Sequence, residues 1–241
     1  MGTLCALRMQ GLLAFAEAGG GNYFRETLWP VLRQLAGGFW TTFLIFALTV
    51  LFSLPLGLAV CSLRMSRFKL LAWVARIYIS VMRGTPLMLQ LLVIFFGPYY
   101  IFGLRLGDGY RFPAVIIAFA LNYAAYFAEI YRGGIESIPL GQYEAANVLG
   151  YSRLQTFFRI ILPQVIKRTL PPVTNEIITL TKDTSLAQVI ACLEMFTVAK
   201  ELAASQASMV PYIAAGVFYY IFNFLVAWAM EGLERKFSYY R

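Results

Sequence analysis

The chain has 241 residues, of which 60% are hydrophobic and 13% are charged, and its formal net charge is +8. This composition lies outside the range of soluble domains and indicates a polytopic membrane protein. Its Lys and Arg residues are scattered between apolar segments, which argues against a nucleic-acid-binding surface. The absence of His and the wide spacing of the three Cys residues give no support to a zinc site or a disulfide framework.

Residues 1–36 are expected to precede a transmembrane domain that occupies residues 37–241. The apolar run at the start is too short, and too interrupted by Arg8 and Glu17, for a convincing signal peptide. This first part is expected to be mobile or to lie on the surface. Residues 22–36 place apolar side chains at helical spacing with charged side chains elsewhere, which predicts an amphipathic helix along the membrane interface.

A spanning helix needs about 20 mostly apolar residues, and five segments are expected to span. The second segment is too long for one upright helix, so a break is expected at Arg83–Pro86. The fourth has poor hydropathy, because it contains Glu176, Lys182 and Asp183. The predicted all-α membrane fold therefore has five spans, at about residues 37–63, 70–102, 111–131, 170–193 and 211–230.

The loops predict the orientation, because Lys and Arg accumulate on the cytoplasmic side of membrane proteins. With the N-terminus outside, the cytoplasmic segments contain 12 of these residues and the opposite side contains 6, while Arg83 and Lys182 stay inside the membrane. This bias favours five spans with the N-terminus outside and the C-terminus inside. It places the polar stretch of residues 137–163 in the cytoplasm.

This cytoplasmic loop has the pattern of two short helices. Pro139 suits the first turn of the first helix, and Gly150 suits the left-handed residue that ends it. Ser152 and Gln155 have the capping-box spacing at the start of the second helix. Pro163 is expected to end that helix.

The first of these two helices carries a candidate docking surface. Glu144 lies near its N-terminal half, where the helix dipole favours a negative charge. Ala145 and Ala146 leave room for the backbone of another protein to come close. From spacing alone, a solvated helical hairpin between two spans is an equally open alternative.

The same loop resembles the signature loop of ABC importer permeases, which reads E-A-A, three residues, G, nine residues, and I-x-L-P. Three further stretches, Arg83–Leu92, Ala128–Ala146 and Leu170–Ile190, are similar to the polar amino acid branch, the permeases for histidine, glutamine, arginine or cystine. The likeness covers about residues 37–241, and the first two dozen residues have no counterpart. The residues that fill the pattern are Glu144, Ala145, Ala146, Gly150, Ile160, Leu162 and Pro163.

The resemblance implies a transport subunit of the bacterial cytoplasmic membrane that is not an enzyme and has no cofactor of its own. Energy then comes from a separate ATPase subunit that binds ATP and Mg²⁺, and no G-x-x-x-x-G-K-[ST] motif occurs in this chain. The implied partners are that ATPase, a second permease subunit, identical or different, an extracytoplasmic amino-acid-binding protein and membrane lipid, with no nucleic acid. The residues expected to contact the ATPase are Glu144, Ala145, Ala146, Asn147 and Gly150.

Polar groups inside the bilayer mark the expected substrate path, because a charge at the membrane centre costs on the order of 3 kcal/mol unless it faces protein or water. On the fourth span, Glu176, Thr179 and Asp183 share one helical stripe. A free amino acid carries an ammonium and a carboxylate, so a pocket is expected to combine an acid with a base or with exposed amides. The candidate substrate-binding residues are Arg83, Thr85, Gln90, Asn122, Tyr126, Glu129, Asn175, Glu176, Asp183 and Ser185.

Structural roles stay open for several of these residues. Arg83 can snorkel or bind a lipid phosphate near the inner face of the membrane. Glu129 lies close to the cytoplasmic end of its span, where an ion pair with Arg132 at i+3 is the more expected role. The residues that can simply contact neighbouring helices are Asn122, Tyr126, Lys182 and Asp183.

Two classes of function remain open. An importer permease transports nothing without its ATPase. A self-contained secondary carrier or channel is also compatible with five spans and intramembrane charges, although no second copy of the signature loop indicates the internal duplication that is common in carriers. A membrane-embedded enzyme is disfavoured, because the chain has no His and no G-x-S-x-G motif.

Overall fold

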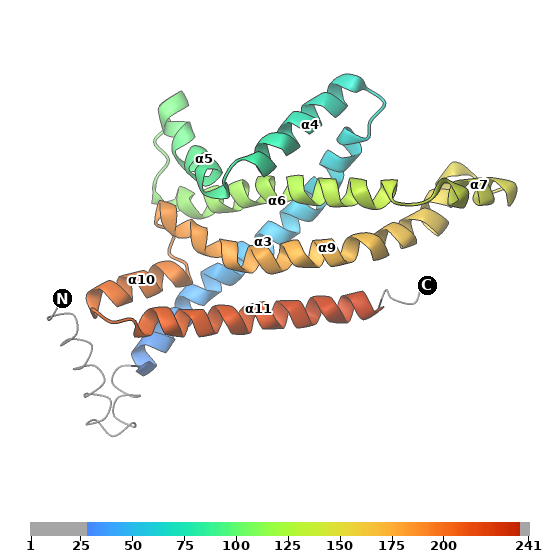
Figure 1. Cartoon of the computed structure of the whole chain (residues 1–241). Helices are drawn as coiled ribbons and strands as arrows, with labels where there is room; N and C mark the ends of the chain where they lie inside the picture. Colours follow the sequence, from blue (N-terminus) through green and yellow to red (C-terminus); the bar gives the residue numbers. More distant parts are fainter. Residues whose placement is uncertain (1–27, 237–241) are drawn as a thin grey trace.

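The structure, a computed structural model, describes residues 28–236, so the expectations for residues 1–27 and 237–241 lie outside it. Every regular element in the described part is helical, as expected. Figure 1 shows α6, α9 and α11 side by side, with α3 crossing them, α7 at one end and α10 at the other. The α-helices are α3 (Trp29–Arg64), α4 (Lys69–Gly84), α5 (Leu87–Phe102), α6 (Arg111–Glu136), α7 (Leu140–Val148), α8 (Arg153–Thr156), α9 (Leu162–Asp183), α10 (Met195–Ser205) and α11 (Val210–Lys236).

Helix α3 begins at Trp29 rather than at Gly37 and is continuous through the whole first span. The part of the expected interfacial helix that lies in the described residues is therefore not separate, because it forms the first turns of α3. Pro30 occupies the first turn, where its missing N–H is no loss. At Gly38, an added Cβ would lie 2.9 Å from the Cα atom of Met195. This close contact with α10 supports a helix through two consecutive glycines, which local propensity alone disfavours.

The second apolar block is broken where the sequence predicts. Helices α4 and α5 meet at an angle of 110°, and Thr85 and Pro86 between them are extended. Proline has no backbone N–H and disfavours a helical conformation in the residue before it, so the helix cannot continue through this dipeptide. We call the residues around this bend, 82–90, the corner.

Helix α6 lies at the centre of the fold. Its side chains Phe119, Tyr123 and Phe127 are buried and belong to the main core cluster, which also contains residues of α3, α5 and α9. At Gly57 of α3, an added Cβ would lie 2.8 Å from the Cβ atom of Phe127, so this glycine lets the two helices approach closely. Polar residues on α6 are therefore placed among several neighbouring helices.

Two of the turn predictions in the polar loop are confirmed. Gly150 follows α7 with φ of +78°, in the left-handed region that favours glycine. The capping box is formed in both directions: Gln155 N donates to Ser152 Oγ at 3.3 Å, and Ser152 N donates to Gln155 Oε1 at 2.9 Å. We call residues 139–156, which contain α7 and α8, the knuckle.

The prediction that Pro163 ends the second helix of this loop is wrong. Helix α8 continues through a π-helical turn, Phe157–Ile161, directly into α9, and Pro163 lies in the first turn of α9. A proline inside a helix removes one hydrogen bond and crowds the carbonyl four residues earlier. The π-helical turn shifts the hydrogen-bond register immediately before the proline, so the chain passes it without a stop.

The fourth predicted span, 170–193, differs from the structure at both ends. Helix α9 already begins at Leu162 and ends at Asp183, and the last part of the expected span forms the 3-10 helix Thr184–Ile190. That 3-10 helix ends at Ala191, whose φ of 53° turns the chain away. The polar side chains of the expected span consequently lie on two kinds of helix.

Helix α10 has no counterpart among the expected elements. Glu194, which is fully buried, caps its N-terminus by accepting hydrogen bonds from Phe196 N at 2.6 Å and Thr197 N at 2.7 Å. The same carboxylate accepts hydrogen bonds from Thr42 Oγ1 of α3 at 3.4 Å and from Tyr219 Oη of α11 at 3.1 Å. Glu194 therefore joins three helices at this end of the molecule.

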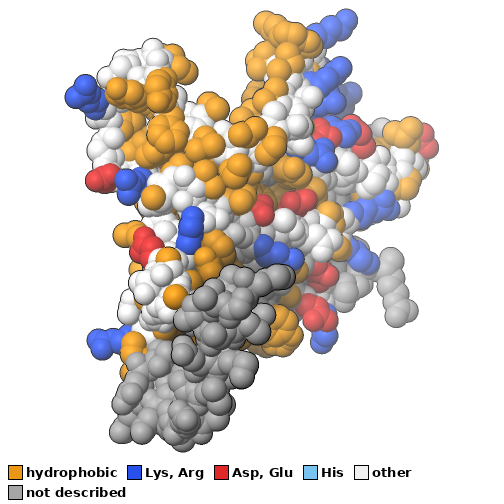
Figure 2. Space-filling view, turned by 60° about the vertical axis from the view of Figure 1, so that its left-hand side comes forward, with side chains coloured by type: hydrophobic (Ala, Val, Ile, Leu, Met, Phe, Trp, Pro, Cys, Tyr) orange, Lys and Arg blue, Asp and Glu red, His pale blue; other side chains and the backbone are white. Residues whose placement is uncertain are grey.

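By length and composition, three of the described helices can each cross a membrane: α3, α6 with the short 3-10 helix before it, and α11. The bent pair α4 and α5 provides a fourth candidate. Apolar side chains cover much of the face in Figure 2, and most of the visible Lys and Arg side chains lie toward its right-hand side. The protein is thus a multi-pass membrane protein.

Candidate functional site

Five candidate substrate-binding residues meet where the corner contacts α6. The guanidinium of Arg83 lies over the ring of Tyr126, 5.2 Å from its centroid, within the range of a cation–π interaction. Gln90 Nε2 donates to Thr85 Oγ1 at 2.8 Å, and Asn122 Nδ2 donates to Gln90 Oε1 at 2.9 Å. The structure thus brings residues from α4, α5 and α6 into one polar group, which we call the corner cluster.

The members of the corner cluster differ in their exposure and in whether their polar groups already have partners within the chain. Asn122 is buried and its amide is engaged within the chain, whereas Arg83 is exposed and Tyr126 is half-buried. Glu176 of α9 is near enough to Arg83 for the two opposite charges to interact. The residues that remain open to a ligand are therefore Arg83 and Tyr126 of the cluster and the neighbouring Glu176.

Helix α9 carries a polar stripe on its exposed side. Asn175, Thr179 and Lys182, spaced by four and three residues, are all exposed. The predicted stripe of Glu176, Thr179 and Asp183 is not equally open, because Asp183 Oδ2 accepts a hydrogen bond from Tyr123 Oη at 2.7 Å. Asp183 is thus tied to the core through α6.

The hydroxyl groups on this part of the chain bond locally. Ser185 Oγ donates to the carbonyl of Lys182 at 2.8 Å, and Thr179 Oγ1 donates to the carbonyl of Asn175 at 2.9 Å. Such bonds to a preceding turn occupy the hydroxyl hydrogen but leave the oxygen able to accept. Asn175 and Ser185 are not brought into the hydrogen bonds of the corner cluster.

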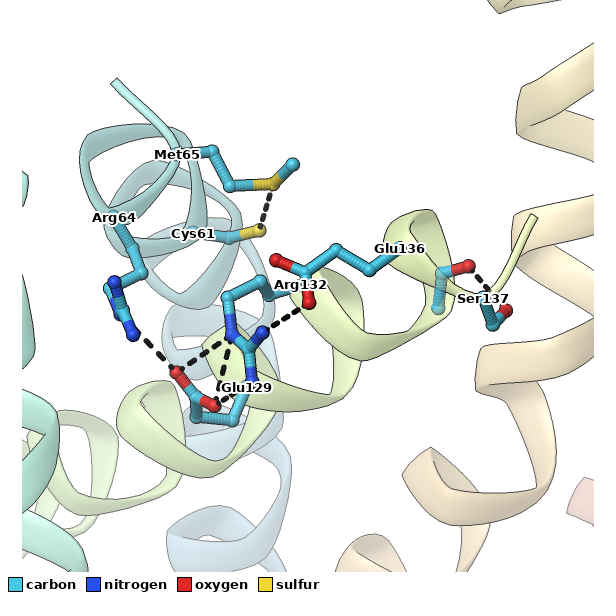
Figure 3. A network of polar contacts seen from close by, with 8 residues as sticks. Cys61, Arg64, Met65, Glu129, Arg132, Glu136 and Ser137 are labelled. Atoms are coloured by element: carbon cyan, nitrogen blue, oxygen red, sulfur yellow. Dashed lines mark hydrogen bonds and ion pairs between the residues drawn. The ribbon is translucent and has the colours of Figure 1, made fainter. Parts of the chain in front are cut away.

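Glu129 belongs to a separate ion network near the end of α6, shown in Figure 3. Its carboxylate accepts hydrogen bonds from Arg132 Nη2 at 2.6 Å and from Arg132 Nε at 3.1 Å, and Arg64 Nε of α3 lies 3.7 Å away. The ion pair with Arg132 expected from the spacing is present. Because both carboxylate oxygens are engaged by arginines, we do not keep Glu129 among the substrate-binding candidates.

Further contacts connect the end of α6 to its neighbours close to the knuckle. Arg132 Nη1 pairs with Glu136 at 2.5 Å, and Arg168 of α9 donates to the carbonyl of Ser137. The Arg64–Glu129 pair joins the ends of α3 and α6 (Figure 3), and the bond from Arg168 to Ser137 joins the end of α6 to α9. These contacts lie next to the knuckle, which is itself connected to α9 by Gln164 Nε2 donating to Gln142 Oε1 at 3.2 Å.

The knuckle presents most of the predicted ATPase-contact residues on its surface. Glu144, Ala145, Asn147 and Gly150 are exposed. Ala146 is buried, only 1% exposed, and faces the chain's own interior. The expectation that Ala146 offers a surface to another protein is therefore wrong, because the contacts of α7 with α8 and the π-helical turn enclose this side.

Four exposed apolar side chains of the knuckle, which we call its apolar tip, were not among the sequence candidates. Val148 is 88% exposed and Leu140 is 77% exposed, and Leu149 and Leu154 also point outward. Large apolar side chains exposed together on a polar loop indicate a contact surface for another protein. The signal in the sequence is the apolar pair Val148–Leu149 directly before the helix-ending Gly150.

Among residues 28–236, no group of His, Cys, Asp and Glu side chains is arranged to hold a metal ion. Cys61 and Cys192 are both buried and unpaired. The polar groups described above are the corner cluster, the polar stripe of α9, the ion network and the Glu194 cap of α10.

Residues 53–239 match the protein family described as the binding-protein-dependent transport system inner membrane component. The chain belongs to this family. The matched region contains the corner, the knuckle and the whole of α6 and α9. Membership implies a substrate-binding protein and an ATPase as partners of this inner membrane component.

Curated relatives in this family are transport permeases. The L-cystine transport system permease protein TcyB of Bacillus subtilis (strain 168) is 38% identical over 218 residues, which cover 90% of this chain and 90% of that protein. The arginine transport system permease protein ArtQ of the same organism is 35% identical over 208 residues, which cover 86% of this chain and 94% of that protein.

Solved structures agree with this assignment. A structure described as an amino acid ABC transporter with histidines has a TM-score of 0.77 and 32% identity, and the match covers 85% of this chain and 94% of that chain. An inward-facing MetNI methionine ABC transporter has a TM-score of 0.65 and 18% identity over 88% of this chain and 97% of that chain, which shows the fold alone. The resemblance to the amino acid branch is confirmed: the chain is a permease subunit of the ABC importer type and not itself an enzyme.

Proposed function

We propose that this permease imports a polar amino acid by alternating access and that a separate ATPase, which binds ATP and Mg²⁺, drives the change. The observation that carries the proposal is the knuckle, which combines the signature loop with an exposed α7 face and an apolar tip at one end of the molecule (Figure 1). The knuckle is bonded to α9 through Gln142 and Gln164, and the ion network next to it joins α3 and α6, which supports a mechanical connection to these helices. The relatives named for cystine and arginine transport support the substrate class.

We further propose five spans, with the N-terminus outside and the C-terminus inside the bacterial cytoplasmic membrane. Helix α9 is then the fifth span, in addition to the four candidates above. It is more polar than they are, but Val173, Ile177 and Leu180 pack in the main core cluster, so α9 is covered by protein on that side. The permease domain in this proposal includes the first turns of α3.

The ATPase contact in this proposal is made by the outer side of the knuckle. Glu144, Ala145, Asn147 and Gly150 face a groove on the ATPase, and the apolar tip formed by Leu140, Val148, Leu149 and Leu154 fills it. Ala146 supports the helix from behind. Because the permease has no nucleotide motif, closing of two ATPase subunits on ATP moves two knuckles, one from each permease of a homodimer or heterodimer.

The substrate contact is made by the open groups around the corner cluster. Arg83 pairs with the carboxylate of the amino acid, and Glu176 pairs with its ammonium, so the two ends of a zwitterion find opposite charges. The ring of Tyr126 lies beneath Arg83 and helps to hold the guanidinium. Further polar contacts in this proposal come from Thr85, Asn175, Ser185 and the Oδ1 atom of Asp183, whose Oδ2 atom accepts from Tyr123.

Reconstitution separates this function from that of a secondary carrier. Vesicles that contain the permease, its ATPase and its amino-acid-binding protein should accumulate a polar amino acid only when ATP is supplied. Vesicles that contain the permease alone should accumulate none, with or without an ion gradient. Uphill uptake by the permease alone on an ion gradient would show that it is a carrier instead.

Replacing Glu176 with Gln should raise the KM for the amino acid about tenfold while leaving the amount of assembled transporter unchanged. The change removes the negative charge opposite the substrate ammonium but keeps the size of the side chain, and a charge-assisted contact of this kind contributes about 1.5–3 kcal/mol. KM is measured from initial uptake rates. The matched control is Glu231→Gln, since Glu231 is exposed and its ion pair with Arg235 at i+4 is exposed as well. An unchanged KM would mean that Glu176 only balances Arg83.

A further inference from the structure

We infer that the side-chain amides of Gln90 and Asn122 are positioning groups: they hold the corner against α6 and thereby set the place of Arg83 in the substrate path. This inference rests on the proposed function, and it assigns to these two residues a role other than direct substrate contact. The argument starts from the backbone group that the broken helix leaves without a partner.

Pro86 deprives one carbonyl of its helical hydrogen bond. In an α-helix, the carbonyl of Met82 would accept from the N–H of residue 86, but proline has none. The last helical bond of α4 runs from Thr85 N to Val81 O at 3.1 Å, so Met82 O is the first carbonyl left without one. A backbone carbonyl left unsatisfied inside a membrane protein costs several kcal/mol, so a replacement donor is required.

The two amides supply that replacement. Gln90 Nε2 donates to Met82 O at 2.9 Å, and Asn122 Nδ2 donates to the same oxygen at 3.0 Å. Gln90 Nε2 also lies 3.1 Å from Thr85 O, so one side chain spans the extended residues between the two helices. Met82 O thus regains two donors in place of the one that Pro86 removed.

The donors of the amide pair are fully used by this arrangement. Each carboxamide nitrogen carries two hydrogens. Asn122 gives its two to Met82 O and Gln90 Oε1, and Gln90 distributes its two over Met82 O, Thr85 O and Thr85 Oγ1. Asn122 is 5% exposed. A substrate carboxylate would therefore have to displace backbone carbonyls to reach either amide.

Arg83 takes its position from this anchor. It follows Met82 directly in the chain, and its guanidinium lies over Tyr126, which is one helical turn after Asn122 on the same face of α6. Asn122 therefore fixes the backbone next to Arg83, and Tyr126 receives its side chain. A third contact, from Tyr78 Oη to the carbonyl of Leu121 at 2.5 Å, holds the preceding turn of α4 to α6.

Thiol labelling of the permease alone tests whether the amides hold the corner. The reporter is Met82→Cys, in a protein whose three native cysteines are replaced by serine. Adding Asn122→Ala or Gln90→Ala should raise the labelling rate of this half-buried thiol about tenfold, the size expected from the loss of two hydrogen bonds between membrane helices. The matched control, Asn223→Ala, removes an amide that accepts from Thr181 on another helix pair and should leave the rate unchanged.

A double-mutant cycle in reconstituted vesicles tests whether the pair acts through Arg83. Asn122→Ala should raise the KM for the amino acid severalfold when Arg83 is present and should add nothing in the Arg83→Ala background. Additive effects would mean that Asn122 contacts the substrate itself and would overturn the inference. Equal labelling rates of the Met82→Cys protein with and without the alanine substitutions would also overturn the inference. That result does not depend on any transport. If the wild-type permease shows no uptake but the labelling rates are as expected, only the proposed function is contradicted.

Discussion

Uptake driven by ATP should fall at least about tenfold when Glu144 is replaced by Arg, while the permease still folds and inserts. Glu144 is exposed on α7, and its helix packs inward through Ala146 on another side, so the substitution disturbs the outer surface only. Reversing a charge at a docking surface places like or unpaired charges across it, which costs several kcal/mol. We expect ATP hydrolysis to continue without stimulation by the loaded binding protein, measured together with uptake in the same vesicles.

The matched control for this uncoupling is Glu231→Arg. It makes the same change of charge at an exposed residue near the C-terminal end of α11, and the pair that it breaks with Arg235 is exposed and worth little. Uptake by this variant should stay within about twofold of the wild type. Unchanged uptake in Glu144→Arg would remove the knuckle from the coupling mechanism.

Replacing Glu194 with Ala should lower the stability of the permease by about 3–5 kcal/mol. The backbone N–H groups of Phe196 and Thr197 would lose the fully buried carboxylate that accepts from them, and each such loss costs about 1–3 kcal/mol. Burial raises the pKa of this carboxyl, and hydrogen bonds from Phe196, Thr197 and Tyr219 oppose the rise. In thermal unfolding of the detergent-solubilised transporter, we expect the melting temperature to fall by about 10 °C.

Glu201→Ala on the same helix provides the control, because Glu201 is exposed. The melting temperature of the Glu201→Ala variant should match that of the wild type. If Glu194→Ala melts at the same temperature as well, α10 does not depend on the buried carboxylate for its attachment to α3 and α11.

Local chemistry in the sequence was enough to predict several features of the fold. The break between α4 and α5 follows from Pro86, which interrupts any helix whatever its neighbours. The end of α7 at Gly150 and the capping box of Ser152 and Gln155 depend on residues that are close in sequence. The signature loop likewise predicted the family, because its residue types and spacing are read directly from the chain.

Features that depend on contacts between helices were missed or placed wrongly. Helix α10 is short, and although Met195, Ala199 and Leu202 are spaced along one buried face, it is also held by Glu194 through Thr42 and Tyr219, which lie far away in the sequence. Pro163 was expected to stop a helix, but the π-helical turn before it lets the chain continue. In each case a tertiary contact or a shift of register outweighed the local signal.

The sequence by itself determined that this is an ABC importer permease with a signature loop and a break in its second apolar block, because composition and short-range spacing carry that information. Only the tertiary structure decided which polar side chains stay free. Asn122 and Gln90 looked as suitable for a substrate as Arg83 and Glu176, yet both amides are engaged by partners within the chain. The deciding donors and acceptors lie on other helices or on backbone carbonyls freed by a break, and residue spacing along one helix does not show where those groups come to lie.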